Sequence, residues 1–201
     1  LEALAKAAGD SPIKRPSDGN AVGSVIFVQN VGQSSTEKGH LPYHSGIGDM
    51  VAIKQSLYFK SKNGDECETT VLFNNLRTPG AAGEDFYRSA QNHGVTFRKG
   101  IASEVVAGGE LEVKFKDKIL DEDTSLMADL VVLDIGMVPN SGPDPYADPL
   151  VANDEEPVAV TVDSILNLDY RQGTDLPQLK HGLNDSHFIC FPYETRRTGI
   201  Y

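Results

Sequence analysis

Residues 127–140 contain the feature that most restricts the fold, a short apolar run followed by residues that end strands. Leu130–Leu133 is apolar without a break, and Gly136 and Pro139 follow it. Such a run favours a central strand buried on both faces of a parallel sheet. Gly136 lets the backbone approach a ligand or another chain segment closely, whereas Pro139 cannot continue a sheet. Ligands of doubly wound sheets bind beyond the carboxyl ends of such strands, but a core strand leading into a turn has the same pattern.

The rest of the chain alternates strand and helix patterns. Met50, Ile53 and Leu57 mark one face of the clearest helix, which Asp49 can cap or stabilise through the helix dipole. Strands are expected at residues 24–29, 70–73 and 95–98, an antiparallel pair at 101–106 and 111–115, a charged turn at 116–125, and helices at 1–8, 49–61 and 83–93. This order predicts an α/β fold with a parallel sheet, right-handed crossovers and a small antiparallel β-ribbon.

Charge and cysteine content limit the partners and the compartment. The net charge of −11 disfavours nucleic acid and anionic membrane surfaces. No apolar run approaches the roughly 20 residues of a bilayer span, and no signal peptide is seen, so we expect no direct membrane insertion. Cys67 and Cys190 lie far apart in the sequence, which indicates neither a disulfide framework nor a cysteine cluster. A reducing cytoplasm is the expected compartment.

The loop at residues 30–48 stands where a dinucleotide fingerprint would open the first helix. Gly32 is followed by 13 residues and then by Gly46 and Gly48, so the loop is longer than a compact GxGxxG turn. Val51 replaces the third glycine of that fingerprint. Two asparagines follow the second strand, where an acidic partner of the ribose would stand. We therefore expect no ordinary NAD(P) binding.

Two other groups of polar residues permit more than one interpretation. His40, His44 and Asp49 could bind a metal or could be solvated loop residues, and their spacing matches no recognised site, so no metal is predicted. Residues 193–197 include two arginines that could hold an anion or could belong to a solvated loop.

Residues 131–140 resemble the segment that closes the nicotinamide-nucleotide domain of flavoproteins in the pyridine nucleotide-disulfide oxidoreductase superfamily. The pattern there is an apolar strand, then Ala-[Thr/Ile]-Gly, then Pro-Asn. Ile135, Gly136, Pro139 and Asn140 match it, whereas Asp134 replaces the usual alanine. The resemblance implies a Rossmann-like, three-layer domain of the nucleotide-binding type.

Four stretches in the same order resemble a narrower family, the flavoproteins that are similar to the A-subunit of heterodisulfide reductase. That family includes flavoprotein subunits of the quinone-interacting membrane-bound oxidoreductase. The matching stretches are residues 15–19, 27–32, 40–55 and 193–201. The resemblance implies an FAD-dependent oxidoreductase of sulfur metabolism that exchanges electrons with iron–sulfur partner subunits.

The departures from the family pattern matter as much as the matches. Many members carry cysteine ligands of an iron–sulfur cluster where Asn30, His44, Gly48 and Asp49 stand here. Because such clusters need thiolates, we expect this chain to lack that cluster. The resemblance, together with the glycine spacing, makes seven residues cofactor-binding candidates: Gly32, Gly46, Gly48, Gly136, Pro139, Thr195 and Gly199.

Three segments are expected along the chain. Residues 1–23 form a helix and a connection, residues 24–140 a nucleotide-domain-like lobe, and residues 141–201 an irregular excursion that returns towards a flavin domain, with a last strand at 187–191. The abrupt ends suggest a piece of a longer protein, so FAD binding would be incomplete and activity of the piece alone is not expected. Three functions remain open: part of an FAD-dependent protein of electron transfer, a non-catalytic interaction or scaffold domain, or an NAD(P)H-binding reductase domain.

Overall fold

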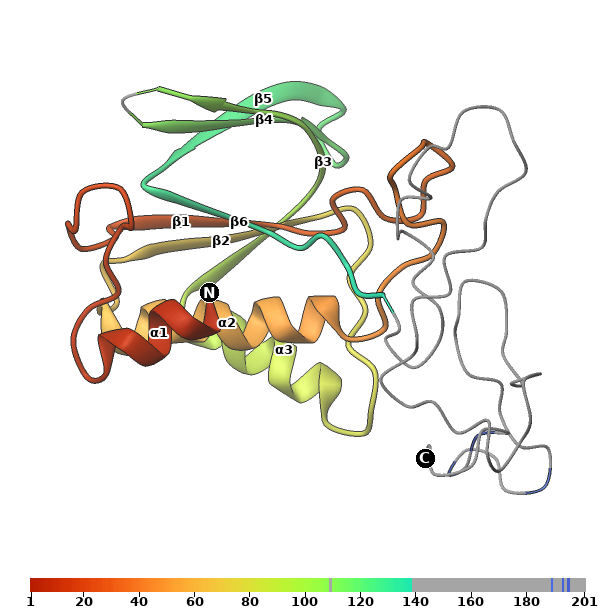
Figure 1. Ribbon diagram of the computed structural model, residues 1–201, viewed down its shortest axis with the longest axis horizontal. Helices are drawn as coiled ribbons and strands as arrows, with labels where there is room; N and C mark the ends of the chain where they lie inside the picture. Colours follow the sequence, from red (N-terminus) through yellow and green to blue (C-terminus); the bar gives the residue numbers. More distant parts are fainter. Residues whose placement is uncertain (109, 139–188, 190–192, 194, 196–201) are drawn as a thin grey trace, which may run out of the picture. The chain divides into compact units, whose positions relative to one another are not determined.

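A computed structural model of the chain describes residues 1–108, 110–138, 189, 193 and 195. The chain divides into two compact units, Leu1–Gly136 and Met137–Tyr201. The helices and strands given below all belong to the first unit (Figure 1). The strand expected at residues 187–191 lies outside the described residues apart from Ile189, which is in a turn.

A parallel layer of four strands forms the centre of the first unit. It contains β1 (Ser24–Val28), β2 (Glu68–Phe73), the first half of β3 (Val95–Ala107) and β6 (Leu130–Leu133). β1 pairs in parallel with β2 on one side and with β6 on the other, and β2 pairs in parallel with β3. Almost every residue of β1 is buried. Its continuous apolar sequence therefore fits a strand that is covered on both faces.

β3 continues beyond the parallel layer into an antiparallel ribbon. There it pairs with β4 (Leu111–Asp117), which pairs with β5 (Glu122–Ala128). The pairing register shifts between Ala102 and Glu104, as at a β-bulge, and bulges bend strands. The ribbon lies over the face of the parallel layer that the helices leave uncovered (Figure 1). The strand order in the described part of the chain is β5-β4-β3-β2-β1-β6.

Three helices cover the opposite face of the parallel layer (Figure 1). They are α1 (Glu2–Ala8), α2 (Gly48–Lys62) and α3 (Gly83–Asn92). Among the described residues, no helix is long and apolar enough to cross a membrane. The expected apolar stripe of α2 is only partly right, because Met50 and Leu57 are half-buried. The most buried side chains of its inward face are Ala52, Ile53, Ser56 and Phe59.

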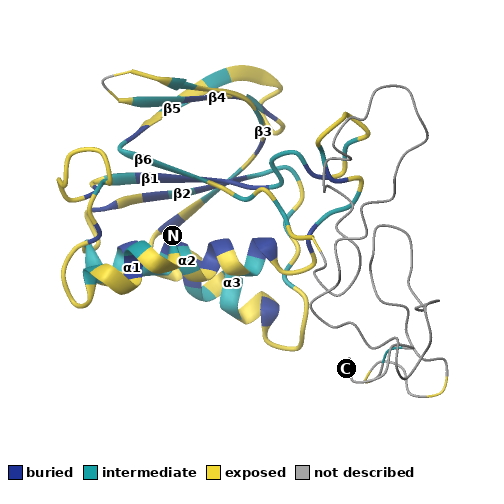
Figure 2. Cartoon of the chain, in the orientation of Figure 1, coloured by how far each residue is buried: buried dark blue, intermediate teal, exposed yellow. Residues whose placement is uncertain are grey.

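Burial is concentrated between the layers (Figure 2). On the helix side, Phe27 of β1 packs edge-to-face against Phe59 of α2, with ring centroids 6.1 Å apart. On the ribbon side, Ile26 of β1 belongs to a second apolar cluster with Phe115 of β4. Alternate residues of β1 thus contribute to two separate cores. The expected three-layer α/β architecture, with a parallel sheet and an antiparallel ribbon, is confirmed.

Two expectations about the strands are wrong. The strands expected at 95–98 and 101–106 form the single strand β3, because the chain bends at the register shift without leaving the sheet. The charged turn expected at 116–125 contains the end of β4 and the start of β5. Only alternate residues of β5 face the core, so its sequence has no apolar run to reveal it.

The expectation of a central strand at Leu130–Leu133 is also wrong. Among the described strands, β6 lies at the edge of the sheet and pairs only with β1. Its first three residues are half-buried, and Leu133 is 47% exposed. An unbroken apolar run therefore identified a strand but did not distinguish an edge from a centre.

Residues 1–23 pack into the same unit as the sheet. Ile13 and Val22 are buried in the helix-side core. Asn63, which follows α2, holds this segment with three side-chain hydrogen bonds. Its Oδ1 accepts from the backbone N–H of Ile13, and its Nδ2 donates to the carbonyls of Ile13 and Val22, each at 2.9 Å.

Candidate functional site

The carboxyl ends of β1 and β6 lie side by side, and the loop between β1 and α2 folds against them. The backbone N–H of Asp134 donates to the Val28 carbonyl at 2.9 Å, and the N–H of Val31 donates to the Asp134 carbonyl at 2.9 Å. Within the loop, the N–H of Leu41 donates to the Gly32 carbonyl at 2.7 Å. Backbone hydrogen bonds thus fix the loop at the carboxyl ends of the strands, where parallel α/β folds usually bind ligands.

The carboxylate of Asp134 accepts hydrogen bonds from three donor groups. Its Oδ2 accepts from Gln33 Nε2 at 3.1 Å and, at the longer distance of 3.5 Å, from the Asn30 N–H. Its Oδ1 accepts from the N–H of Gly136 at 3.1 Å. The same carboxylate lies against Gly48, the first residue of α2, where an added Cβ would come within 2.6 Å of Oδ2.

Gln33 connects this carboxylate to the start of α2. Its Oε1 accepts from the N–H of Ser45 at 2.7 Å, while Ser45 Oγ accepts from the N–H of Gly48 at 3.0 Å. Gln33 and Ser45 are both buried. Ser45 therefore caps the helix by accepting from a free N–H of its first turn. From the sequence, capping was one of the two roles considered for Asp49. The capping role of Asp49 is wrong, although its place in the first turn still suits the helix dipole.

A second polar network lies beside the first. Asn30 Nδ2 is 3.0 Å from His44 Nε2 and donates to Asp49 Oδ1 at 3.4 Å, while His44 Nε2 is 3.3 Å from Asp49 Oδ2. The backbone N–H of Arg77 donates to Asp49 Oδ2 at 2.8 Å. The side chains of His44 and Asp49 are only 4% and 1% exposed. The network therefore joins β1, the loop, α2 and the segment after β2 in a buried position.

The glycines predicted to contact a cofactor differ in their surroundings. Gly136 has a φ of 84°, and an added Cβ would lie 2.5 Å from Leu41 Cδ1 and 2.8 Å from Gln33 Cδ. A Cβ on Gly32 would meet the ring of His40 at 3.4 Å, whereas one on Gly46 would meet nothing within 4 Å. The close approach expected at Gly136 is therefore made by another segment of this chain.

The remaining candidates are Thr195, Pro139 and Gly199. Thr195 is half-buried and belongs to the second unit, while Pro139 and Gly199 lie outside the described residues. Sequence reasoning missed the roles of Gln33 and Ser45. The one available signal was Asp134, a charged residue where the family pattern has alanine.

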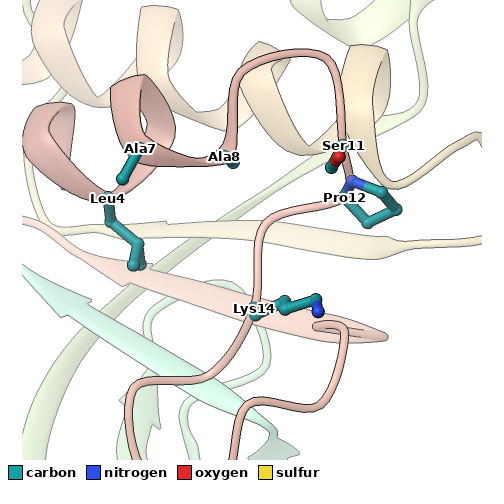
Figure 3. A pocket seen from close by; sticks show the side chains of 6 residues that line it. All are labelled: Leu4, Ala7, Ala8, Ser11, Pro12 and Lys14. Atoms are coloured by element: carbon teal, nitrogen blue, oxygen red, sulfur yellow. The ribbon is translucent and has the colours of Figure 1, made fainter.

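A separate pocket of about 330 Å³ lies beside α1, away from the carboxyl ends of the strands. Figure 3 shows its lining, which is aliphatic apart from Ser11 and Lys14. It brings together no group of catalytic or ligating side chains. Across the described residues, no set of three or more His, Cys, Asp and Glu side chains is arranged to hold a metal ion.

The parallel sheet, the helices on one face and the ribbon on the other define an α/β domain of the nucleotide-binding type. No family model matches the chain. It is 33% identical over 147 residues to the A-subunit of the H(2):CoB-CoM heterodisulfide,ferredoxin reductase of Methanothermobacter marburgensis, and the match covers 71% of this chain and 22% of the relative. The chain belongs to the family of heterodisulfide reductase A-subunits and their relatives.

Other relatives give the same result. The second iron-sulfur A-subunit of the CoB--CoM heterodisulfide reductase of Methanopyrus kandleri is 32% identical over 150 residues, covering 72% of this chain and 23% of the relative. The corresponding iron-sulfur A-subunit of Methanocaldococcus jannaschii is 34% identical over 129 residues, covering 62% and 19%. The chain thus spans about a fifth of the length of these relatives. Among solved structures, a T. acidophilum thioredoxin reductase is 18% identical, covers 58% of this chain and 32% of that chain, and has a TM-score of 0.35.

The described residues of this site do not fit an iron–sulfur cluster. Asn30, His44 and Asp49 offer no thiolate, which such clusters require. Cys67 is the one cysteine among the described residues. It directly precedes β2 and so lies at the amino ends of the parallel strands, opposite the site. It is buried, and burial raises the pKa of its thiol. Beyond the carboxyl end of β1, the side chains of Asp134 and Gln33 are joined by a hydrogen bond of 3.1 Å.

Proposed function

We propose that this chain is the nucleotide-domain-like portion of an FAD-dependent oxidoreductase of the heterodisulfide reductase type. The complete protein would pass electrons through FAD to or from iron–sulfur partner subunits in a reducing cytoplasm. The observation that carries this proposal is the identity of 33% over 147 residues with the A-subunit of a heterodisulfide,ferredoxin reductase. The redox reaction is proposed from the name of that relative, a reductase. Because the name is that of a subunit, we also expect partner subunits.

Within that protein we assign this domain a scaffold role without nicotinamide binding. The support is the edge beyond β1, which the hydrogen-bonded side chains of Asp134 and Gln33 fill. A working NAD(P)H reductase domain would need that space for the pyrophosphate. The second candidate is an interaction module without a cofactor. For this domain alone, the burial of the Asn30–His44–Asp49 network favours it, because buried side chains are not available to a ligand.

The flavin contacts are assigned mainly to the far end of the chain. Thr195 and Gly199 belong to the tail that resembles the motif leading to the flavin. Pro139 belongs to the segment that resembles the close of the nucleotide domain, and its cofactor role stays a prediction. For Gly32, Gly46, Gly48 and Gly136, a cofactor role stays a prediction. Of these four, Gly46 has open space beside it, so a ligand could approach its backbone without displacing a side chain.

Analysis of the complete natural protein, purified without oxygen, tests this proposal. We expect stoichiometric FAD on release by denaturation, bleaching of the flavin by a low-potential electron donor, and no bleaching by NADH. A colourless complete protein would favour the interaction module. Rapid flavin reduction by NADH would favour the reductase domain, and either result would overturn the proposal.

A further inference from the structure

We propose that the Asp134 carboxylate is a built-in anion that occupies the phosphate position of this domain and so excludes nucleotides. Asp134 is thus the residue that determines ligand specificity at the carboxyl end of β1. The inference deepens the proposed scaffold role and rests on it. The ligand class at issue is a phosphate or pyrophosphate group, whether free or part of a nucleotide.

The first support is the identity of the groups around the carboxylate. In folds of this type a phosphate binds backbone N–H groups at the start of the helix that follows the first strand. Here the Asp134 oxygens accept hydrogen bonds from donors outside that helix, the N–H of Gly136 and the side chain of Gln33, with the N–H of Asn30 close by. Donors of this kind suit any oxyanion, and the chain itself provides one.

The second support is the position of the carboxylate. It lies directly against Gly48, the first residue of α2, so closely that an added Cβ there would be 2.6 Å from Oδ2 and 3.0 Å from Oδ1. The positive end of the helix dipole stabilises a negative charge at this place. A phosphate could not enter without displacing a group of the same charge.

The third support is that the neighbouring side chains leave the carboxylate little freedom. Gln33 is buried, and its other amide atom is held by the N–H of Ser45 at 2.7 Å. Gly136 is packed against Leu41 and Gln33. The donors are therefore already oriented, and shortening the Asp134 side chain would leave an oriented set of donors without its anion.

Substitution of Asp134 tests the inference as a gain of binding. Asp134→Ala and Asp134→Ser remove the charge and most of the volume, and serine keeps a small polar group in case alanine impairs folding. Asp123→Ala is the matched control, since it removes one negative charge from an exposed position on β5. Each variant of the 201-residue chain is checked by circular dichroism and titrated calorimetrically with inorganic pyrophosphate, ADP and adenosine.

We expect the native chain and Asp123→Ala to bind none of the three probes at millimolar concentration. Asp134→Ala, Asp134→Ser or both should bind pyrophosphate and ADP at least tenfold more tightly, but not adenosine. Three outcomes would overturn the inference: no gain in a folded variant, an equal gain in Asp123→Ala, or failure of both Asp134 variants to fold, which would make the carboxylate a structural requirement only. None of these outcomes bears on whether the complete protein contains FAD.

Discussion

At Gly136, both the packing and the backbone conformation require a residue without a side chain. Its φ of 84° is unfavourable for other residues, and Leu41 and Gln33 occupy the space that a side chain would need. We expect Gly136→Val to lower the free energy of unfolding by about 2–4 kcal/mol, from overpacking together with left-handed backbone strain. Urea denaturation followed by circular dichroism measures this change.

Gly46 provides the matched control in the same loop region. A Cβ added there meets nothing within 4 Å, and its φ lies outside the left-handed region. We expect Gly46→Ala to change the free energy of unfolding by less than about 1 kcal/mol, in the stabilising direction if the loop is otherwise unaltered. Equal stabilities for the two variants would show that Gly136 lies in an open turn.

Asp49 accepts hydrogen bonds that no other described side chain replaces. Its removal leaves the Arg77 N–H and the Asn30 amide with a lost partner in a buried place. We expect Asp49→Ala to cost about 2–4 kcal/mol of folding free energy, the range for breaking a buried charged network. Asp85→Ala, at an exposed position in the first turn of α3, should cost less than about 1 kcal/mol. Similar losses for both variants would contradict the network.

Part of the site could be predicted from single residues and part could not. Gly32, Gly46 and Gly48 became candidates through their spacing, Gly136 through its place after an apolar run, and Asp134 was visible as a departure from a family pattern. Its partner Gln33 lies 101 positions away in sequence, so only the pairing of β1 with β6 brings the two together. The same holds for Arg77, whose contribution is a backbone N–H and therefore has no signature in the residue type.

Among the elements, long periodic segments were predicted well and edge strands were not. The sequence predicted α2 and α3 to within a residue or two, because each buries one face and ends at turn residues. β5 was missed, since an edge strand with one solvated face needs few apolar residues. β6 was found but placed in the centre, because its apolar residues meet cores on both faces although β1 is its one partner among the described strands.

Asn63 joins the end of α2 to the segment that precedes the sheet. Because its side chain makes three hydrogen bonds to Ile13 and Val22, Asn63→Ala should cost about 3 kcal/mol, at roughly 1 kcal/mol for each bond. Limited proteolysis should then cut within residues 9–23 before it cuts elsewhere in the first unit. Asn92→Ala, at the exposed end of α3, should leave stability and cleavage unchanged. Unchanged cleavage in Asn63→Ala would mean that residues 1–23 are held by other contacts.

At the scale of the whole molecule, the first unit has the architecture of a nucleotide-binding-type domain, and its own side chains form hydrogen-bonded networks beyond the carboxyl ends of β1 and β6. The two polar networks beyond β1 tie the loop to β6 and α2. In the proposed function, they take the place that a cofactor would need. The match covers only 22% of the Methanothermobacter relative. In the proposed function, a domain of this kind holds neighbouring parts of a longer protein in position without binding a nucleotide itself. The family relationship and the filled edge are thus compatible.

Titration of the 201-residue chain with NADH tests this account most directly. Calorimetry with NADH up to millimolar concentration should detect no saturable binding, because Asp134 and Gln33 occupy the edge beyond β1. A thermal unfolding scan with and without NADH should agree, since a ligand that does not bind the native state cannot raise the unfolding temperature. A dissociation constant in the micromolar range, with one site per chain, would contradict the account.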